Sequence, residues 1–181
     1  DAPAKRLMPM IKLGEMLTNP SGTAVHSLYV FSSNPAITAP DQNVVRNGLM
    51  RDDLFTVVHE RFFTDTCKYA DIVLPATTSV EHDDIYNSYG HYTIGTGYKL
   101  IDPIGESRSN WQVISELAKR MGLTDEFFKH SERELIDQIV SASHRISKAD
   151  QNLILQGGPV EMTLPENYKL DFKTPSGKIE L

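Results

Sequence analysis

The sequence predicts an α/β protein, namely a partial doubly wound (Rossmann-like) parallel sheet with an added hairpin and a helical segment. Three short apolar runs, at 28–31, 54–59 and 71–75, have the length and composition of buried strands. Helical patterns lie between these runs and the connections are short, which is the order found in doubly wound parallel sheets. Three strands are too few for a complete sheet of this kind, so the sequence indicates half of a larger domain.

The elements of the first half follow from apolar periodicity and from turn-forming residues. In order, they are a helix at 6–18 ended by a turn at 19–22, a strand at 28–31, a loop at 32–35, a helix at 42–50 capped by Asp41, a strand at 54–59, a helical turn from Thr64 or Asp65 to Ala70, and a strand at 71–75. Cys67 lies in that helical turn. It is expected to be a small packing residue, because no His or Asn partner pattern accompanies it.

The composition changes after Glu81. Tyr and Gly are frequent at 85–102, which predicts an irregular loop followed by a hairpin. Two amphipathic helices are expected, one at 109–121 with Ser109 as N-cap and Gly122 as C-cap, and one at 132–143. Their inward residues are expected to be Trp111, Val113, Ile114, Leu117 and Ala118 in the first, and Leu135, Ile136, Ile139 and Val140 in the second. Residues 145–170 have weak periodicity and are expected to be mostly loop, and 172–181 to be a turn that leads into a strand.

The expected domain organisation has three parts. Residues 1–103 form part of an α/β domain, 104–145 form a helical segment that packs on it, and 146–181 form a loop-rich tail. The chain begins at Asp1 without a methionine and stops at Leu181 inside an expected strand. We therefore expect a piece of a longer protein.

Composition excludes several classes of function. The chain has 181 residues, 40% hydrophobic and 23% charged, with a net charge of −6 and no Lys/Arg run, so we expect no nucleic-acid partner. No apolar stretch approaches the roughly 20 residues needed to span a bilayer, so we expect no direct membrane insertion. The single cysteine cannot form an internal disulfide or a four-cysteine iron–sulfur site.

Candidate ligand-binding residues follow the predicted strands, because ligands of open parallel sheets bind beyond the carboxyl ends of the strands. Asn34 follows the first strand and offers both donor and acceptor groups, while His59 and Glu60 end the second. The Glu60 carboxylate has the geometry to accept two parallel hydrogen bonds from the N1–H and N2–H₂ edge of guanine. Asp65, at the start of the helical turn, would disfavour a phosphate there, which favours base recognition. The alternatives are an ordinary Asn-Pro turn, a solvated strand end and a helix cap.

A second cluster of polar residues invites a metal site. Glu81, His82, Asp83, Asp84 and His91 are of the ligand types that zinc, manganese and iron use. Their spacing matches no established ligand pattern, and a solvated loop is the favoured interpretation. The sequence contains no Ser/His/Asp arrangement, Walker loop or Gly-x-Gly-x-x-Gly motif, so it predicts no catalytic residues in this chain.

Residues 57–76 resemble a signature of the molybdopterin oxidoreductase family, which includes dimethyl sulfoxide reductases, periplasmic nitrate reductases and formate dehydrogenases. The residues that carry the resemblance are Thr64, Thr66, Cys67, Ala70-Asp71, Ile72-Val73 and Leu74-Pro75. Supporting matches flank the segment in the expected order, at Asn34-Pro35, Glu81, Pro103 to Trp111 and Thr174 to Glu180.

The resemblance implies a place in a larger enzyme. Members bind two molybdopterin guanine dinucleotides, which chelate one molybdenum or tungsten ion, and this chain resembles part of the domain that holds one dinucleotide. By motif position, the residues that line the cofactor site are Asn34, His59, Glu60, His82 and Asn110. Glu60 stands where the family commonly has Asp, and His82 and Asn110 stand where some relatives have Lys and Asp.

The resemblance also implies what lies elsewhere. The metal-binding residue and a C-terminal barrel belong to other parts of the parent, and so do the ligands of a 4Fe-4S cluster, which this chain would not bind. Expected partners are the remaining domains of the parent polypeptide and electron-transfer subunits. The compartment, cytoplasmic or periplasmic, stays open because an export signal would lie upstream. The isolated chain is expected to be inactive.

Two rival functions remain. One is a free-standing nucleotide-binding module without redox activity. The other is a small metal hydrolase built on Glu81, His82, Asp84 and His91.

Overall fold

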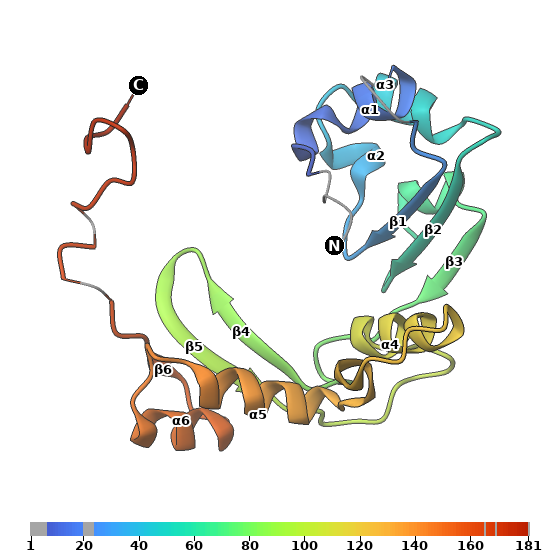
Figure 1. Cartoon of the computed structure of the whole chain (residues 1–181). Coiled ribbons are helices and arrows are strands. Elements are labelled where there is room, and N and C mark those ends of the chain that lie inside the picture. The colour runs from blue at the N-terminus through green and yellow to red at the C-terminus, as the bar shows by residue number, and fades with distance from the viewer. Residues whose placement is uncertain (1–6, 20–23, 165, 169, 181) are drawn as a thin grey trace. The chain divides into compact units, whose positions relative to one another are not determined.

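The computed structural model of the chain describes residues 7–19, 24–164, 166–168 and 170–180 (Figure 1). The chain forms two compact units. The first comprises Asp1–Thr78 and Pro103–Met121, and the second comprises Ser79–Asp102 and Gly122–Leu181. Residues 103–121 group with the first unit, and the residues of the hairpin group with the second. The domain boundaries at residues 103 and 145 stay a prediction.

A three-stranded parallel sheet organises the first unit. Its strands are β1 (Ser27–Phe31), β2 (Phe55–Glu60) and β3 (Ile72–Pro75), with β2 in the centre. Phe31 is in register with His59, and Glu60 with Pro75, so the three strands end at one edge. A further parallel bridge joins Ala76 to Arg108 beside the end of β3. The α/β class, the three strands and their parallel order are confirmed.

The helical elements of the first unit are η1 (Met10–Lys12), α1 (Leu13–Thr18), α2 (Pro35–Thr38), α3 (Gln42–Leu49), η2 (Asp65–Tyr69) and α4 (Asn110–Arg120). The first helix was predicted too long. Pro9 disfavours a helical conformation in the residue before it, and the helix begins only at Met10. Arg6 and residues 20–22 of the predicted turn lie outside the described residues. The predicted cap at Asp41 is wrong in mechanism, because this residue has a left-handed backbone (φ 54°) and its side chain makes no capping hydrogen bond.

Two apolar clusters fix the first unit. Val30 and Val58 point to one face of the sheet and pack against the buried Cys67 of η2, which confirms that this cysteine is a packing residue. A second cluster joins α1, α2, α3 and the residue before β2. Its buried members are Leu17, Ala36, Ala39, Val45, Leu49 and Leu54. The helical elements therefore hold the loop after β1 and the loop after β2 against one side of the sheet.

Helix α4 confirms its predicted cap. The Ser109 hydroxyl accepts from the Gln112 N–H at 3.2 Å, the Gln112 side chain accepts in return from the Ser109 N–H, and Gly122 follows the helix with φ 76°. The predicted inward face is only partly correct. Ser115 and Ala118 are buried, whereas Ile114 is 38% and Leu117 46% exposed. The buried face of α4 is therefore narrower than its apolar stripe.

The second unit contains the predicted hairpin, formed by β4 (Asp84–Ser88) and β5 (His91–Gly97). Its helical elements are η3 (Glu126–Lys129), α5 (Glu132–Ala142) and α6 (Lys148–Leu155), and β6 (Val160–Glu161) pairs with β5. In α5 the predicted Ile136 and Val140 are buried, but Ile139 is 54% exposed. No described helix is long and apolar enough to cross a membrane.

Residues 145–170 are mostly loop, as predicted, but they also contain a helix that was not predicted. Ser147 caps this helix, α6, by accepting from the Asp150 N–H, and Ile154 and Val160 enter the apolar core of this unit. The strand predicted at the end of the chain is wrong. No strand forms in the described part of 172–181. There the Thr174 hydroxyl donates to the Lys178 carbonyl at 2.7 Å, and this local bond closes a turn instead.

Candidate functional site: the carboxyl edge of the parallel sheet

The candidate site lies at the edge where the three parallel strands end. Three loops leave this edge, with Ser32 and Asn34 after β1, Glu60 at the end of β2, and Ala76 after β3. The start of α4 joins them, because the Arg108 N–H donates to the Pro75 carbonyl at 3.1 Å. Four of the five predicted residues, namely Asn34, His59, Glu60 and Asn110, belong to this unit.

Asn34 ties the loop after β1 to the loop after β2. Its Oδ1 accepts from the Thr66 N–H at 3.2 Å and from the Thr66 hydroxyl at 2.7 Å. The same hydroxyl oxygen accepts from the Ala36 N–H at 3.2 Å. Because Thr66 is fully buried, these bonds satisfy polar groups that water does not reach. The Asn34 Oδ1 is therefore used within the protein, and the Nδ2 group is the part that remains for a ligand.

His59 is fully buried. Its Nε2 lies 3.1 Å from the Arg108 carbonyl oxygen, to which it donates in the tautomer that carries the proton on Nε2. This bond holds the segment before α4 against the end of β2. The Nδ1 atom has no hydrogen-bond partner among the described residues. His59 therefore lies within the protein, where it holds the segment before α4 and does not face solvent.

Glu60 is the acceptor at this edge. Its side chain is only 9% exposed, and one carboxylate oxygen accepts from the Arg61 N–H at 2.7 Å. The Arg61 guanidinium lies 3.7 Å from the same oxygen and is itself 45% exposed. An ionised carboxylate has about four lone-pair positions, so this group retains acceptor capacity toward a donor that approaches the edge.

Asn110 is the first residue of α4. Its Nδ2 lies 3.5 Å from the Ser32 hydroxyl, at the outer limit of a hydrogen bond, and its Oδ1 is buried without a partner in the described chain. Ser32 has a left-handed backbone (φ 49°). That conformation costs a non-glycine residue energy and is concentrated at functional sites. The contacts of Ser32, Thr66 and Arg108 were not predicted from the sequence, because their partners lie far along the chain.

The Asp65 carboxylate at the start of η2 is paired with a positive charge, which was not expected from the sequence. The Lys68 ammonium lies 2.7 Å from the Asp65 carboxylate, and this hydrogen bond lowers the pKa of Asp65 and raises the pKa of Lys68. The negative charge that was expected to disfavour a phosphate is therefore paired. The expectation of base recognition at this edge therefore no longer follows from Asp65.

His82, the fifth predicted residue, belongs to the second unit. Its Nε2 lies 3.6 Å from the Asp84 carboxylate, and its side chain is 20% exposed. Glu81 is buried. Within the described residues, no group of three or more His, Cys, Asp or Glu side chains is arranged to hold a metal ion. The rival metal hydrolase therefore gains no support from the geometry.

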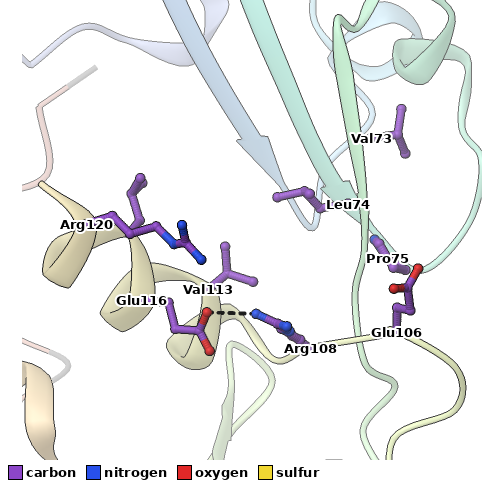
Figure 2. Close-up of a pocket in the computed structure, with 9 residues that line it drawn as sticks. Val73, Leu74, Pro75, Glu106, Arg108, Val113, Glu116 and Arg120 are labelled. Carbon is purple, nitrogen blue, oxygen red and sulfur yellow. Dashed lines mark hydrogen bonds and ion pairs between the residues drawn. The ribbon is translucent and has the colours of Figure 1, made fainter.

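A pocket of about 430 Å³ lies between the end of β3 and α4 in the first unit (Figure 2). Val73, Leu74, Pro75, Val113 and Leu117 form its apolar lining, and Glu106, Arg108, Glu116 and Arg120 its polar part. Arg108 and Glu116 point toward one another and form an ion pair of 2.8 Å (Figure 2). None of the predicted site residues lines this pocket, which is separate from the Glu60 carboxylate.

The fold defines an α/β protein with a parallel sheet, and comparison with known proteins gives its family. Residues 4–120 match the molybdopterin oxidoreductase family, and the chain belongs to this family. It is 40% identical over 179 residues to "Probable oxidoreductase YoaE" of Bacillus subtilis and 33% identical over 180 residues to "Probable oxidoreductase YyaE" of the same organism. Each match covers 97% of this chain and 26% of the relative, so the chain spans about a quarter of the length of these proteins.

One solved structure shows the same fold over most of the chain. Acetylene hydratase from Pelobacter acetylenicus aligns with a TM-score of 0.74 and 24% sequence identity, over 94% of this chain and 24% of that one. At this identity the likeness concerns the fold alone.

Proposed function

We propose that the first unit contributes part of the binding site for one molybdopterin guanine dinucleotide in a longer oxidoreductase that uses two such cofactors with molybdenum or tungsten. The observation that carries the proposal is the Glu60 carboxylate, which is largely enclosed at the carboxyl end of the central strand and retains acceptor capacity. In open parallel sheets this edge is where nucleotides bind.

The hydrogen-bonding groups at this edge fit a guanine nucleotide. The N1–H and N2–H₂ groups of guanine are adjacent donors, and a carboxylate accepts both at once, whereas adenine lacks this pair of donors. Asn110 Oδ1 is buried and lacks a partner among the described residues, so a ligand donor would satisfy it. Asn34 uses its Oδ1 atom to accept from Thr66, and its Nδ2 group is proposed as a donor to the dinucleotide.

The other two predicted residues enter the proposal differently. His59 is proposed as a positioning residue, because it is buried and its hydrogen bond to Arg108 fixes the segment that carries Asn110. His82 of the second unit is proposed as a polar contact to the dinucleotide, on the basis of its motif position and partial exposure.

When bound, the cofactor supplies two-electron oxygen-atom or hydrogen transfer at its metal. The residues of this chain bind and orient the dinucleotide. We propose that the metal ligand and the ligands of a 4Fe-4S cluster come from other parts of the parent polypeptide, and that electron-transfer subunits are its partners. The 181-residue chain alone is expected to show no turnover with an artificial electron donor, and turnover would refute this expectation.

The decisive experiment compares nucleotides that differ in the recognised edge. GMP, IMP and AMP are titrated into the 181-residue chain and into the Glu60→Gln variant, with binding followed by NMR. IMP keeps N1–H but lacks the amino group, so the wild type should prefer GMP over IMP and IMP over AMP. Loss of a charge-assisted bond costs about 1.5–3 kcal/mol, so Glu60→Gln should weaken GMP binding roughly 10- to 100-fold.

The matched control is Glu106→Gln, which removes the charge of an exposed glutamate in the same unit. It should leave the preference for GMP unchanged. In the parent enzyme, Glu60→Gln should also lower the content of metal and pterin. Equal binding of GMP and AMP by the wild type, or an unchanged preference in Glu60→Gln, would overturn the proposed role of Glu60.

A further inference from the structure

Two exposed aromatic side chains follow Glu60 closely in the sequence, in the loop after β2. Phe62 is 73% exposed and Phe63 is 74% exposed, although both lie within three residues of a side chain that is only 9% exposed. A phenylalanine ring buries about 150–250 Å² when it packs, so two adjacent exposed rings offer a large area for contact with a planar ligand. At the end of β2 an enclosed carboxylate is thus followed by two uncovered rings.

The loop that carries the two rings is tied to the protein. The Phe62 carbonyl accepts from the Thr64 N–H at 2.9 Å, and the Thr64 carbonyl accepts from the Cys67 N–H at 3.0 Å. Cys67 is buried in the apolar cluster under the sheet. The rings therefore extend from a backbone that is anchored on one side to the sheet and on the other to η2. An anchored presentation reduces the conformational entropy that a ligand would have to overcome.

We infer that Phe62 and Phe63 form a stacking surface for the purine ring whose edge Glu60 accepts. A planar base needs two kinds of contact, namely hydrogen bonds at its edge and a π-surface on its face. Glu60 supplies the first kind and the adjacent phenylalanines supply the second. The inference rests on the proposed function, because it assigns the aromatic surface to the same nucleotide.

The two contacts have different chemical signatures. Stacking on an aromatic ring tolerates every base, because each base has a π-face. Hydrogen bonding to Glu60 discriminates among bases. Loss of the phenylalanines should therefore weaken the binding of GMP and of IMP by the same factor and preserve the preference for GMP. Loss of the Glu60 carboxylate should weaken the binding of GMP more than that of IMP and so reduce this preference.

The experiment titrates GMP and IMP into the 181-residue chain and into Phe62→Leu, Phe63→Leu and the double variant. The double variant should bind both nucleotides roughly tenfold more weakly. The upfield ring-current shift of the purine H8 proton should disappear. Replacement of the ring that contacts the base by tryptophan should keep both the affinity and the shift. Because the rings are exposed, the circular dichroism spectrum and the unfolding midpoint should not change.

Phe127→Leu is the matched control, since this phenylalanine is 49% exposed and belongs to the second unit. It should leave both affinities unchanged. A wild type that prefers GMP, together with a double variant that binds it within twofold of wild type, would overturn the stacking inference and leave the proposed function standing. A wild type without a guanine preference, whose binding to both nucleotides still falls in the double variant, would overturn the role of Glu60 and retain the aromatic surface.

Discussion

The hydrogen bonds between Asn34 and Thr66 should decide whether the carboxyl edge of the sheet holds its shape. Asn34→Ala removes an acceptor of two hydrogen bonds and leaves the N–H and the hydroxyl of a fully buried threonine without that partner. Each unsatisfied buried group costs about 1–3 kcal/mol. Part of this cost is relieved, because the hydroxyl can turn toward another acceptor. We therefore expect a loss of about 2–4 kcal/mol in the free energy of unfolding of the first unit.

Asn34→Asp is the informative companion variant. It keeps an oxygen that accepts both bonds but removes the Nδ2 donor, so the unit should stay within about 1 kcal/mol of wild-type stability. If Nδ2 donates to the nucleotide, as proposed, Asn34→Asp should lose GMP affinity without losing stability. The pair of variants thus separates the structural use of Asn34 from its proposed use in binding.

The assay is urea unfolding followed by the fluorescence of Trp111, the single tryptophan, which lies in α4 of the first unit. Thr66→Val completes a double-mutant cycle with Asn34→Ala. Because each single change already breaks the hydroxyl bond of 2.7 Å, the double variant should be less destabilised than the sum of the two, by about 1 kcal/mol. Additive losses, or a loss in Asn34→Ala below about 0.5 kcal/mol, would show that the bonds between Asn34 and Thr66 do not stabilise the first unit.

Two further predictions concern a buried hydroxyl and a helix cap. The Tyr29 hydroxyl oxygen is buried without a partner among the described residues, and burial raises the pKa of this phenol. Tyr29→Phe should therefore be neutral or stabilising by up to about 1 kcal/mol in the same urea assay, and a clear loss would reveal a partner for the hydroxyl. In the capping box of α5, the Glu134 carboxylate accepts hydrogen bonds from the backbone N–H of Ser131 and from its hydroxyl. These bonds, the backbone one most of all, hold the pKa of Glu134 below its usual value. This stabilisation is complete above the unfolded-state pKa of about 4.3 and is lost as the pH falls through the lower folded-state pKa. Glu134→Gln should flatten that part of the dependence of stability on pH, and an unchanged profile would contradict it.

The strands could be predicted from the sequence because their signal is local. Short apolar runs bounded by turn residues suffice to locate β1, β2 and β3, and the cap at Ser109 follows from a pattern of four residues. The missed helix α6 has eight residues, of which only Gln151 and Ile154 are buried. One apolar anchor does not create a detectable period. The tertiary contacts of its unit stabilise that helix, and they are not visible in a short window of sequence.

The site could be predicted only as a place along the chain. Strand ends identify Asn34 and Glu60 because parallel strands end at a common edge. The partners of these residues lie too far away to infer from sequence. Thr66 is 32 positions from Asn34, and Arg108 is 49 positions from His59. Whether a polar residue binds a ligand or satisfies a buried neighbour depends on such contacts. The sequence therefore predicts where the strands end, but not which polar residues there bond to other parts of the protein.

His59 and Glu60 are neighbours in β2, but their side chains have different surroundings. Successive residues of a strand point to opposite faces of the sheet. Val58 faces the cluster with Val30 and Cys67, while His59 faces the other side, where its ring lies 6.4 Å from that of Tyr29. Two neighbours in one strand therefore cannot present their side chains in the same direction. The structure uses the buried imidazole to hold the segment before α4 and leaves the following carboxylate, which ends the strand, as the acceptor at the edge. The hydrogen bond from His59 to Arg108 fixes the segment beside the Glu60 carboxylate. Replacing His59 should therefore disturb the proposed site by shifting that segment, whereas replacing Glu60 should remove the acceptor that is proposed to recognise the base.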